Sequence, residues 1–117
     1  MSLSYIDWEV DGITVLNLSG ALILGDGTRV FRQLIDDAIA LGKTNLIVNL
    51  AEVYRLDSTG LGELVRAHTA VLRHGGTLKL LKLRPRAQEL LQLTKLYTLF
   101  ELFDTEDSAV KSFKPDR

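Results

Sequence analysis

Residues 54–63 read YRLDSTGLGE and place an acid, two hydroxyls and two glycines at the expected start of a helix. Asp57 or Ser58 can cap that helix by accepting a backbone N–H, a contribution of about 1 kcal/mol. The unpaired N–H groups and the positive end of the helix dipole also favour an anion at this point. A phosphate on Ser58 would bring about 1.5 to 2 negative charges into that setting. The residues alone therefore leave Ser58 as either a helix cap or a phosphate acceptor.

The two glycines of this segment, Gly60 and Gly62, need an explanation that capping does not give. Each glycine inside a helix costs about 1 kcal/mol relative to alanine. Glycine also lets other atoms approach the backbone closely. We therefore expect a partner protein, a ligand or a neighbouring strand to lie against this turn. We also expect Leu61 to pack partly into the core, because apolar residues recur on its helix face.

No set of residues in the sequence suggests a catalytic or metal centre. Nothing supplies a general base within evident reach of Ser58, and the acid pairs at residues 36–37 and 106–107 fall on separate expected helices. The phosphate-binding patterns Gly-x-Gly-x-x-Gly and Gly-Lys-Ser/Thr are absent. The basic run LKLRPR at residues 81–86 lacks interleaved aromatic residues. We expect a protein that is not an enzyme and uses no cofactor, metal or nucleic acid; a nucleotide-binding domain built on the glycine turn is a further hypothesis.

A β-hairpin is expected at the start of the chain. Residues 4–10 alternate in polarity, which places Ile6, Trp8 and Val10 on one face of a half-buried strand. Asp11-Gly12 supplies a turn, and residues 13–20 continue as a second strand. Trp8 is then expected to anchor the hairpin to the core.

Strands and helices alternate along the rest of the chain. Apolar runs at residues 45–50 and 77–83 predict inner strands, and residues 98–103 predict a short strand or a buried connection. Helical spacing and helix-start signals between these runs predict about four helices. The sequence thus predicts an α/β fold with a mixed sheet entered through an antiparallel hairpin. Ser58 falls at the carboxyl end of the strand at residues 45–50, where open α/β sheets place their sites.

Length and composition narrow the class of protein. The 117 residues suit one domain, expected to span residues 1–117 with a core from about residue 4 to residue 113. The formal net charge of -1 argues against a module for nucleic acid or an anionic membrane surface. There are no cysteines, no signal-peptide pattern and no apolar run near the roughly 20 residues of a membrane span. We therefore expect a cytoplasmic protein.

The stretch VNLAEVYRLDSTGLGELV, residues 48–65, resembles the hallmark segment of the STAS domain in anti-sigma factor antagonists. In that family a strand ending in Asn-Leu is followed by Asp-Ser-Ser/Thr-Gly-Leu-Gly and a helix. The element order over residues 4–113 is similar as well. The resemblance implies a bacterial signalling protein that binds an anti-sigma factor with serine kinase activity and thereby frees a sigma factor for transcription. Phosphorylation then switches the antagonist off, and a serine phosphatase resets it.

The resemblance also implies roles for individual residues. Ser58 becomes the phosphate acceptor, with Thr59 as the alternative, and Asp57 becomes its acidic neighbour at the start of the helix. The implied partner-binding surface consists of the residues of the motif itself: Asp57, Ser58, Thr59, Gly60, Leu61 and Gly62.

One stretch departs from the family pattern. Many relatives carry Gly-Glu-Leu-Asp after the second strand, whereas this chain has Gly20-Ala21-Leu22-Ile23 and its first acid at Asp26. If acids of that loop help to choose the partner, then the partner or the loop arrangement of this chain differs. An alternative function is a STAS scaffold or a transport-complex subunit that uses the same surface without phosphorylation.

Overall fold

The residues of alternating polarity at the start of the chain form the first strand of the predicted hairpin. In it, β1 (Leu3–Val10) pairs antiparallel with β2 (Ile13–Leu22). The computed structural model describes residues 2–114. Three further strands run parallel to β2 and complete a sheet in the order β1-β2-β3-β4-β5: β3 (Asn45–Leu56), β4 (Thr77–Leu81) and β5 (Leu102–Phe103). The predicted α/β class with a mixed sheet is therefore confirmed.

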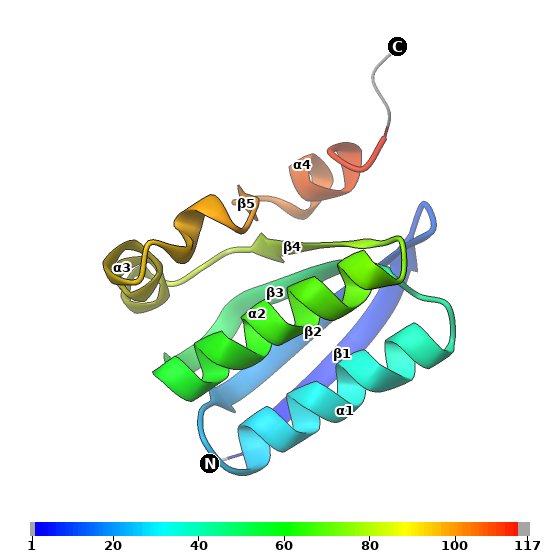
Figure 1. Ribbon diagram of the computed structural model, residues 1–117. Coiled ribbons are helices and arrows are strands. Elements are labelled where there is room, and N and C mark those ends of the chain that lie inside the picture. Colours follow the sequence, from blue (N-terminus) through cyan, green and yellow to red (C-terminus); the bar gives the residue numbers. More distant parts are fainter. Residues whose placement is uncertain (1, 115–117) are drawn as a thin grey trace.

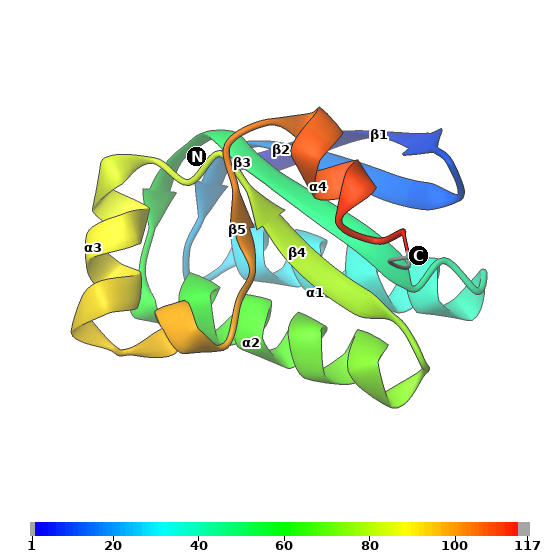
Figure 2. The same cartoon turned by 90° about the horizontal axis from the view of Figure 1, so that it is seen from above.

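The helices lie in two layers on either side of the sheet. α1 (Asp26–Ala40) and α2 (Ser58–Arg73) cover one face, and the larger apolar cluster lies between them and the strands (Figure 1). The short helix α4 (Glu106–Lys111) lies on the opposite face over a smaller cluster (Figure 2). α3 (Pro85–Leu93) and the 3-10 turn η1 (Leu96–Thr98) lie at the end of the sheet toward which β3 points (Figure 2).

Two strand boundaries differ from the prediction for a physical reason. β3 runs to Leu56 instead of residue 50, because β2 is ten residues long and pairs with β3 as far as Leu22 opposite Leu56. β4 ends at Leu81, where the next residue, Lys82, turns to a φ of 56° and leaves the sheet. The region at residues 98–103 holds the end of η1 and the two-residue strand β5.

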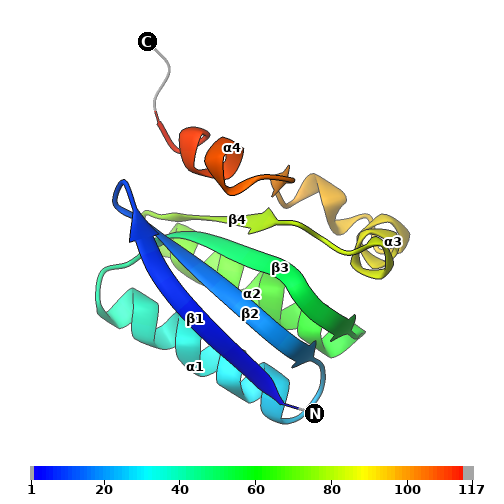
Figure 3. The same ribbon diagram turned by 180° about the vertical axis from the view of Figure 1, so that it is seen from behind.

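The predicted role of Trp8 is wrong. Trp8 is 47% exposed and Ile6 is 68% exposed, whereas Leu3 is buried. Because side chains alternate along β1, Trp8 lies on the face opposite Leu3, which packs in the larger cluster under α1 and α2. Figure 3 shows this side of the hairpin without a covering helix along most of its length. The Trp8 indole N–H donates to Glu106 of α4 at 3.2 Å. Trp8 therefore ties the hairpin to α4 at the surface and does not anchor it in the core.

Candidate functional site

The carboxyl ends of β2 and β3 lie side by side, and this pairing brings two loops together. The register of Leu22 with Leu56 places the loop that follows β2 next to the turn that starts α2. Asp57 joins them: its Oδ1 accepts from the Gly60 N–H at 2.7 Å, and its Oδ2 accepts from the Leu24 N–H at 3.0 Å. Asp57 is thus the N-cap of α2 and the tie between the two loops.

The cap assignment decides a question that the sequence left open. Both Asp57 and Ser58 could have capped α2, but the cap is Asp57 and Ser58 is the first residue of the helix proper. Ser58 and Thr59 are both exposed. Within residues 2–114 the Ser58 hydroxyl takes no hydrogen-bond partner. Its side chain therefore has no structural task in this fold and is open to another protein.

The Asp57 carboxylate is held in its ionised form. Partial burial alone would raise its pKa, but hydrogen bonds from the backbone N–H groups of Leu24 and Gly60 outweigh this effect and lower the pKa below its usual value. Hydrogen bonds to the charged form of an acid favour that form. The turn at Ser58 therefore carries a fixed negative charge at neutral pH.

Gly60 is explained by the neighbouring strand, which was one of the three expectations for the glycines. A Cβ on Gly60 would lie 2.0 Å from the carbonyl oxygen of Leu22 and 3.0 Å from Cδ1 of Leu56. Any side chain there would push α2 away from the ends of β2 and β3. Gly62 differs, because it is exposed and a Cβ at that position would meet nothing within 4 Å.

The six residues of the expected partner surface therefore divide into two groups. Gly60 and Leu61 lie inside the protein, with Leu61 only 3% exposed. The other four reach the surface in full or in part: Asp57, Ser58, Thr59 and Gly62. A partner that docks on this turn would meet the second group directly, while Gly60 and Leu61 fix the position of the helix that presents it.

Arginine and tyrosine side chains lie beside this turn, a proximity that the sequence alone does not predict. A groove of about 390 Å³ is lined by Ile23, Tyr54, Arg55, Leu56, Asp57 and Arg86. The Arg84 guanidinium stacks on the Tyr54 ring at 4.3 Å from its centroid. The run LKLRPR has no aromatic residue of its own, and its aromatic partner, Tyr54, comes from β3. The sequence holds both parts of this arrangement: Arg55 near the end of β3, and the basic run that begins at the end of the neighbouring parallel strand β4.

Other ionisable groups form separate pairs that hold the helices. Arg32 of α1 makes two hydrogen bonds with the buried Glu63 of α2, from Nε at 3.1 Å and from Nη2 at 2.6 Å. Arg66 of α2 pairs with Asp36 of α1 at 3.1 Å. Across residues 2–114, no group of three or more potential ligands is placed to hold a metal ion. In the same part of the chain, no helix is long and apolar enough to cross a membrane.

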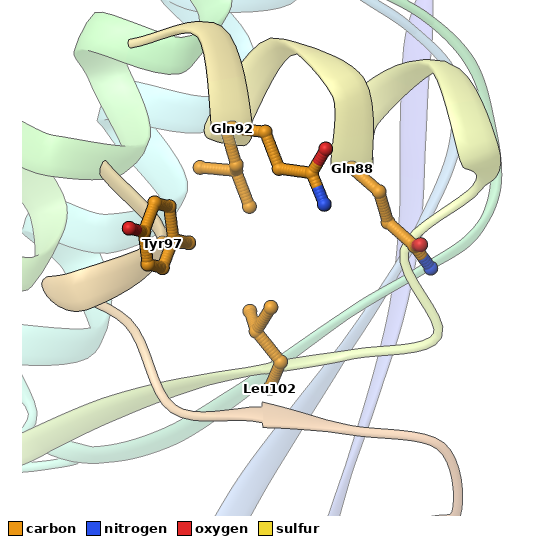
Figure 4. A pocket seen from close by; sticks show the side chains of 5 residues that line it. Gln88, Gln92, Tyr97 and Leu102 are labelled. Carbon is orange, nitrogen blue, oxygen red and sulfur yellow. The ribbon is translucent and has the colours of Figure 1, made fainter. Parts of the chain in front are cut away.

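A second hollow lies between α3, η1 and β5, apart from Ser58. It has a volume of about 440 Å³ and is lined by Gln88, Leu91, Gln92, Tyr97 and Leu102. Figure 4 shows Leu102 on β5 pointing across this hollow toward the glutamines of α3, with the Tyr97 ring at one side. Its lining contains no acid, base or histidine, so it offers no group for acid–base chemistry at neutral pH.

Comparisons with known proteins fit this geometry. A model of the STAS domain family matches residues 8–109. The anti-sigma F factor antagonist of Paenibacillus polymyxa is 25% identical over 100 residues, which make up 85% of each chain. An anti-sigma factor antagonist from Mycobacterium paratuberculosis is 25% identical, with a TM-score of 0.83 over 95% of this chain and 93% of that one. The Bacillus cell fate determinant SpoIIAA in its phosphorylated form is 23% identical, with a TM-score of 0.74 over 95% of this chain and 100% of its own.

Proposed function

The chain belongs to the STAS domain family, and from this membership we propose that it is an anti-sigma factor antagonist controlled by phosphorylation of Ser58. Unmodified, it binds an anti-sigma factor that is also a serine kinase, and the sigma factor is released for transcription in the cytoplasm. Phosphorylation of Ser58 ends this binding, and a serine phosphatase restores it. The protein itself carries out no catalysis in this scheme.

One observation carries the assignment of Ser58. Asp57 supplies the helix cap, and the neighbouring Ser58 hydroxyl is exposed and without a hydrogen bond in the described part of the chain. A modified Ser58 would leave the cap in place, so the fold would tolerate the phosphate. Thr59 is also exposed and stands as the alternative acceptor.

The proposed switch works through charge. A phosphate would add its negative charge beside the ionised Asp57 carboxylate. If a partner carboxylate lay roughly 6 Å away at an effective dielectric of about 20, each added unit of charge would oppose binding by roughly 3 kcal/mol before salt screening. Even a third of that free energy, allowing for screening at an exposed site, weakens an affinity about fivefold. In this scheme one phosphate shifts the equilibrium toward release of the partner.

Two relatives support the proposal in different ways. The Paenibacillus polymyxa protein is named as an anti-sigma F factor antagonist and matches most of this chain. SpoIIAA, which shares the fold, has been solved in a phosphorylated form. The choice of Ser58 rests on its geometry and on the motif around it.

A capture experiment tests the proposal. Wild type, Ser58→Ala and Ser58→Asp are used as bait in extracts of the source cells, and bound proteins are identified by mass spectrometry. Wild type and Ser58→Ala should recover an anti-sigma factor of the kinase type, and Ser58→Asp should not. Thr69→Asp, at an exposed position further along α2, is the matched control for an added charge away from the turn and should still recover the anti-sigma factor. Equal recovery of a different complex by all four proteins would instead indicate a scaffold or a transport-complex subunit.

A further inference from the structure

Arginines from two distant parts of the sequence meet beside the turn at Ser58. Arg55 is the penultimate residue of β3, and Arg84 and Arg86 flank Pro85 at the start of α3. Arg55 and Arg86 line the same groove as Asp57, and Arg84 and Arg86 line an adjoining hollow of about 260 Å³. We call this surface, formed by Tyr54 and the three arginines, the arginine groove.

Arg84 and Arg86 of the arginine groove keep their positive charge without an ion pair in the described part of the chain. Elsewhere, arginines such as Arg32 and Arg66 pair with acids of the facing helix. Among the residues that the structure describes, neither Arg84 nor Arg86 has a carboxylate within ion-pair distance. Of the acids nearby, the ionised Asp57 accepts from two backbone N–H groups and Glu52 accepts from the Tyr54 hydroxyl, and in the described part of the chain neither forms an ion pair with Arg84 or Arg86.

Arg84 is held in place before any partner arrives. Its guanidinium stacks on Tyr54, and Nη1 donates to the Ala51 carbonyl oxygen at 3.0 Å. The following residue, Pro85, has a restricted backbone at the start of α3. A side chain that is already ordered loses less conformational freedom on binding, and a guanidinium has a fork of donors that matches a carboxylate. Arg84 is therefore preorganised for an anionic group.

From this charge, order and position we infer that the arginine groove docks an acidic segment of the partner protein, one that carries at least two carboxylates. The inference rests on the proposed function, because it takes a partner that binds at Ser58 and names the chemistry of its contact. It also gives the phosphate on Ser58 a way to act. The phosphate repels the acidic segment and competes with it for the same arginines.

A peptide titration tests the chemistry of the arginine groove without the natural partner. The probe is a capped octapeptide of alternating glutamate and glycine. Its binding is monitored through the amide chemical shifts of the full-length protein. We expect shifts at Tyr54, Arg55 and Arg86, and none with the same peptide carrying glutamine. Arg86→Glu should weaken binding by roughly fivefold, as expected for losing one exposed ion pair and gaining a repulsion.

Arg73→Glu is the matched control, because Arg73 is exposed at the opposite end of α2 and the change in net charge is the same. It should change the affinity by less than about twofold, the limit set by screened charges at long range. If Arg86→Glu does not give the circular dichroism spectrum of a folded protein, Arg86→Gln takes its place in the titration. Equal weakening by Arg73→Glu, equal binding of the glutamine peptide, or tighter binding of an oligouridylate RNA than of the acidic peptide would overturn the inference.

The captured partner separates this inference from the proposed function. If Ser58→Asp loses the anti-sigma factor while Arg86→Glu keeps full affinity for it, the switch stands and the acidic docking is wrong. If the glutamate peptide binds the arginine groove as expected but Ser58→Asp still recovers every partner, the docking chemistry is supported and the proposed switch fails.

Discussion

The Asp57 carboxylate bonds on two sides, to Gly60 of its own helix and to Leu24 of the loop that follows β2. Ser58, one residue further on, bonds to neither. We predict that Asp57→Ala lowers the free energy of unfolding by about 2 kcal/mol, from a lost cap and a lost hydrogen bond to a charged group. Ser58→Ala should change it by less than about 0.5 kcal/mol, as surface substitutions do. Urea unfolding measures both. Equal losses would make Ser58 part of the cap and weaken its case as a free acceptor.

The lowered pKa of Asp57 makes part of the stability depend on pH. Because the folded pKa lies below the unfolded value of about 3.9, ionised Asp57 stabilises the fold above that pH. This stabilisation is lost as the pH falls through the folded pKa. We predict that the difference in unfolding free energy between wild type and Asp57→Asn is constant from pH 7 to about pH 5 and shrinks in more acidic solution. A difference that grows on acidification would contradict the hydrogen-bond geometry.

The two glycines of the turn should respond in opposite directions. Gly60→Ala places a methyl group 2.0 Å from the Leu22 carbonyl oxygen, so we expect a loss of roughly 2 kcal/mol or more as α2 is displaced. Gly62→Ala meets no atom within 4 Å and should stabilise the protein by up to about 1 kcal/mol through helix propensity. Thermal unfolding compares them. If Gly62→Ala is stable but binds the captured partner less well, Gly62 is a contact residue; a destabilised Gly62→Ala would show that the exposed geometry is wrong.

At the scale of elements, α4 is fastened to the sheet by one buried cation. Lys79 of β4 is 5% exposed, and its Nζ contacts the Ser112 Oγ at 2.7 Å and the Glu101 carboxylate at 2.9 Å. The same ammonium lies 4.4 Å from the centroid of the Phe113 ring.

We predict that Lys79→Ala costs about 2 kcal/mol and acts locally. Amide hydrogen exchange should accelerate at Ala109 and Val110 of α4, because these residues lose the contact that holds their segment. Exchange in the middle of α1 and α2, on the other face of the sheet, should change far less. Uniform acceleration over all helices would mean that Lys79 stabilises the whole domain and not the α4 attachment.

The elements also show what the sequence could and could not predict. Alternation, caps and Pro85 predicted the hairpin, the helices and the position of Ser58 after a strand, because these are local properties of the chain. Alternation says which residues share a face, but it does not say which face later helices will cover, and Trp8 was misplaced for that reason. The extension of β3 to Leu56 depends on pairing with β2, and the arginine groove depends on two segments about thirty residues apart. Those features arise from tertiary structure.

For the whole molecule, the important asymmetry is between the two ends of the sheet. The loop after β2, the turn before α2 and the start of α3 gather at the end toward which β2 and β3 point (Figure 2). The chain as a whole has a formal charge of -1, yet this end carries Arg55, Arg84 and Arg86, and Arg55 and Arg86 line the same groove as Asp57, the neighbour of the exposed Ser58. In the proposed switch, a charge added at Ser58 would change the surface that a partner meets without altering the packed layers behind it.

The central claim is that a phosphate on Ser58 controls partner binding, and a direct affinity comparison tests it. The captured anti-sigma factor is titrated by calorimetry into the unmodified protein and into protein with phosphoserine incorporated at position 58. The account predicts binding at least roughly fivefold weaker for the phosphorylated protein, with a smaller difference at high salt. Equal affinities for the two forms would contradict the switch and leave Ser58 as an exposed residue without a regulatory role.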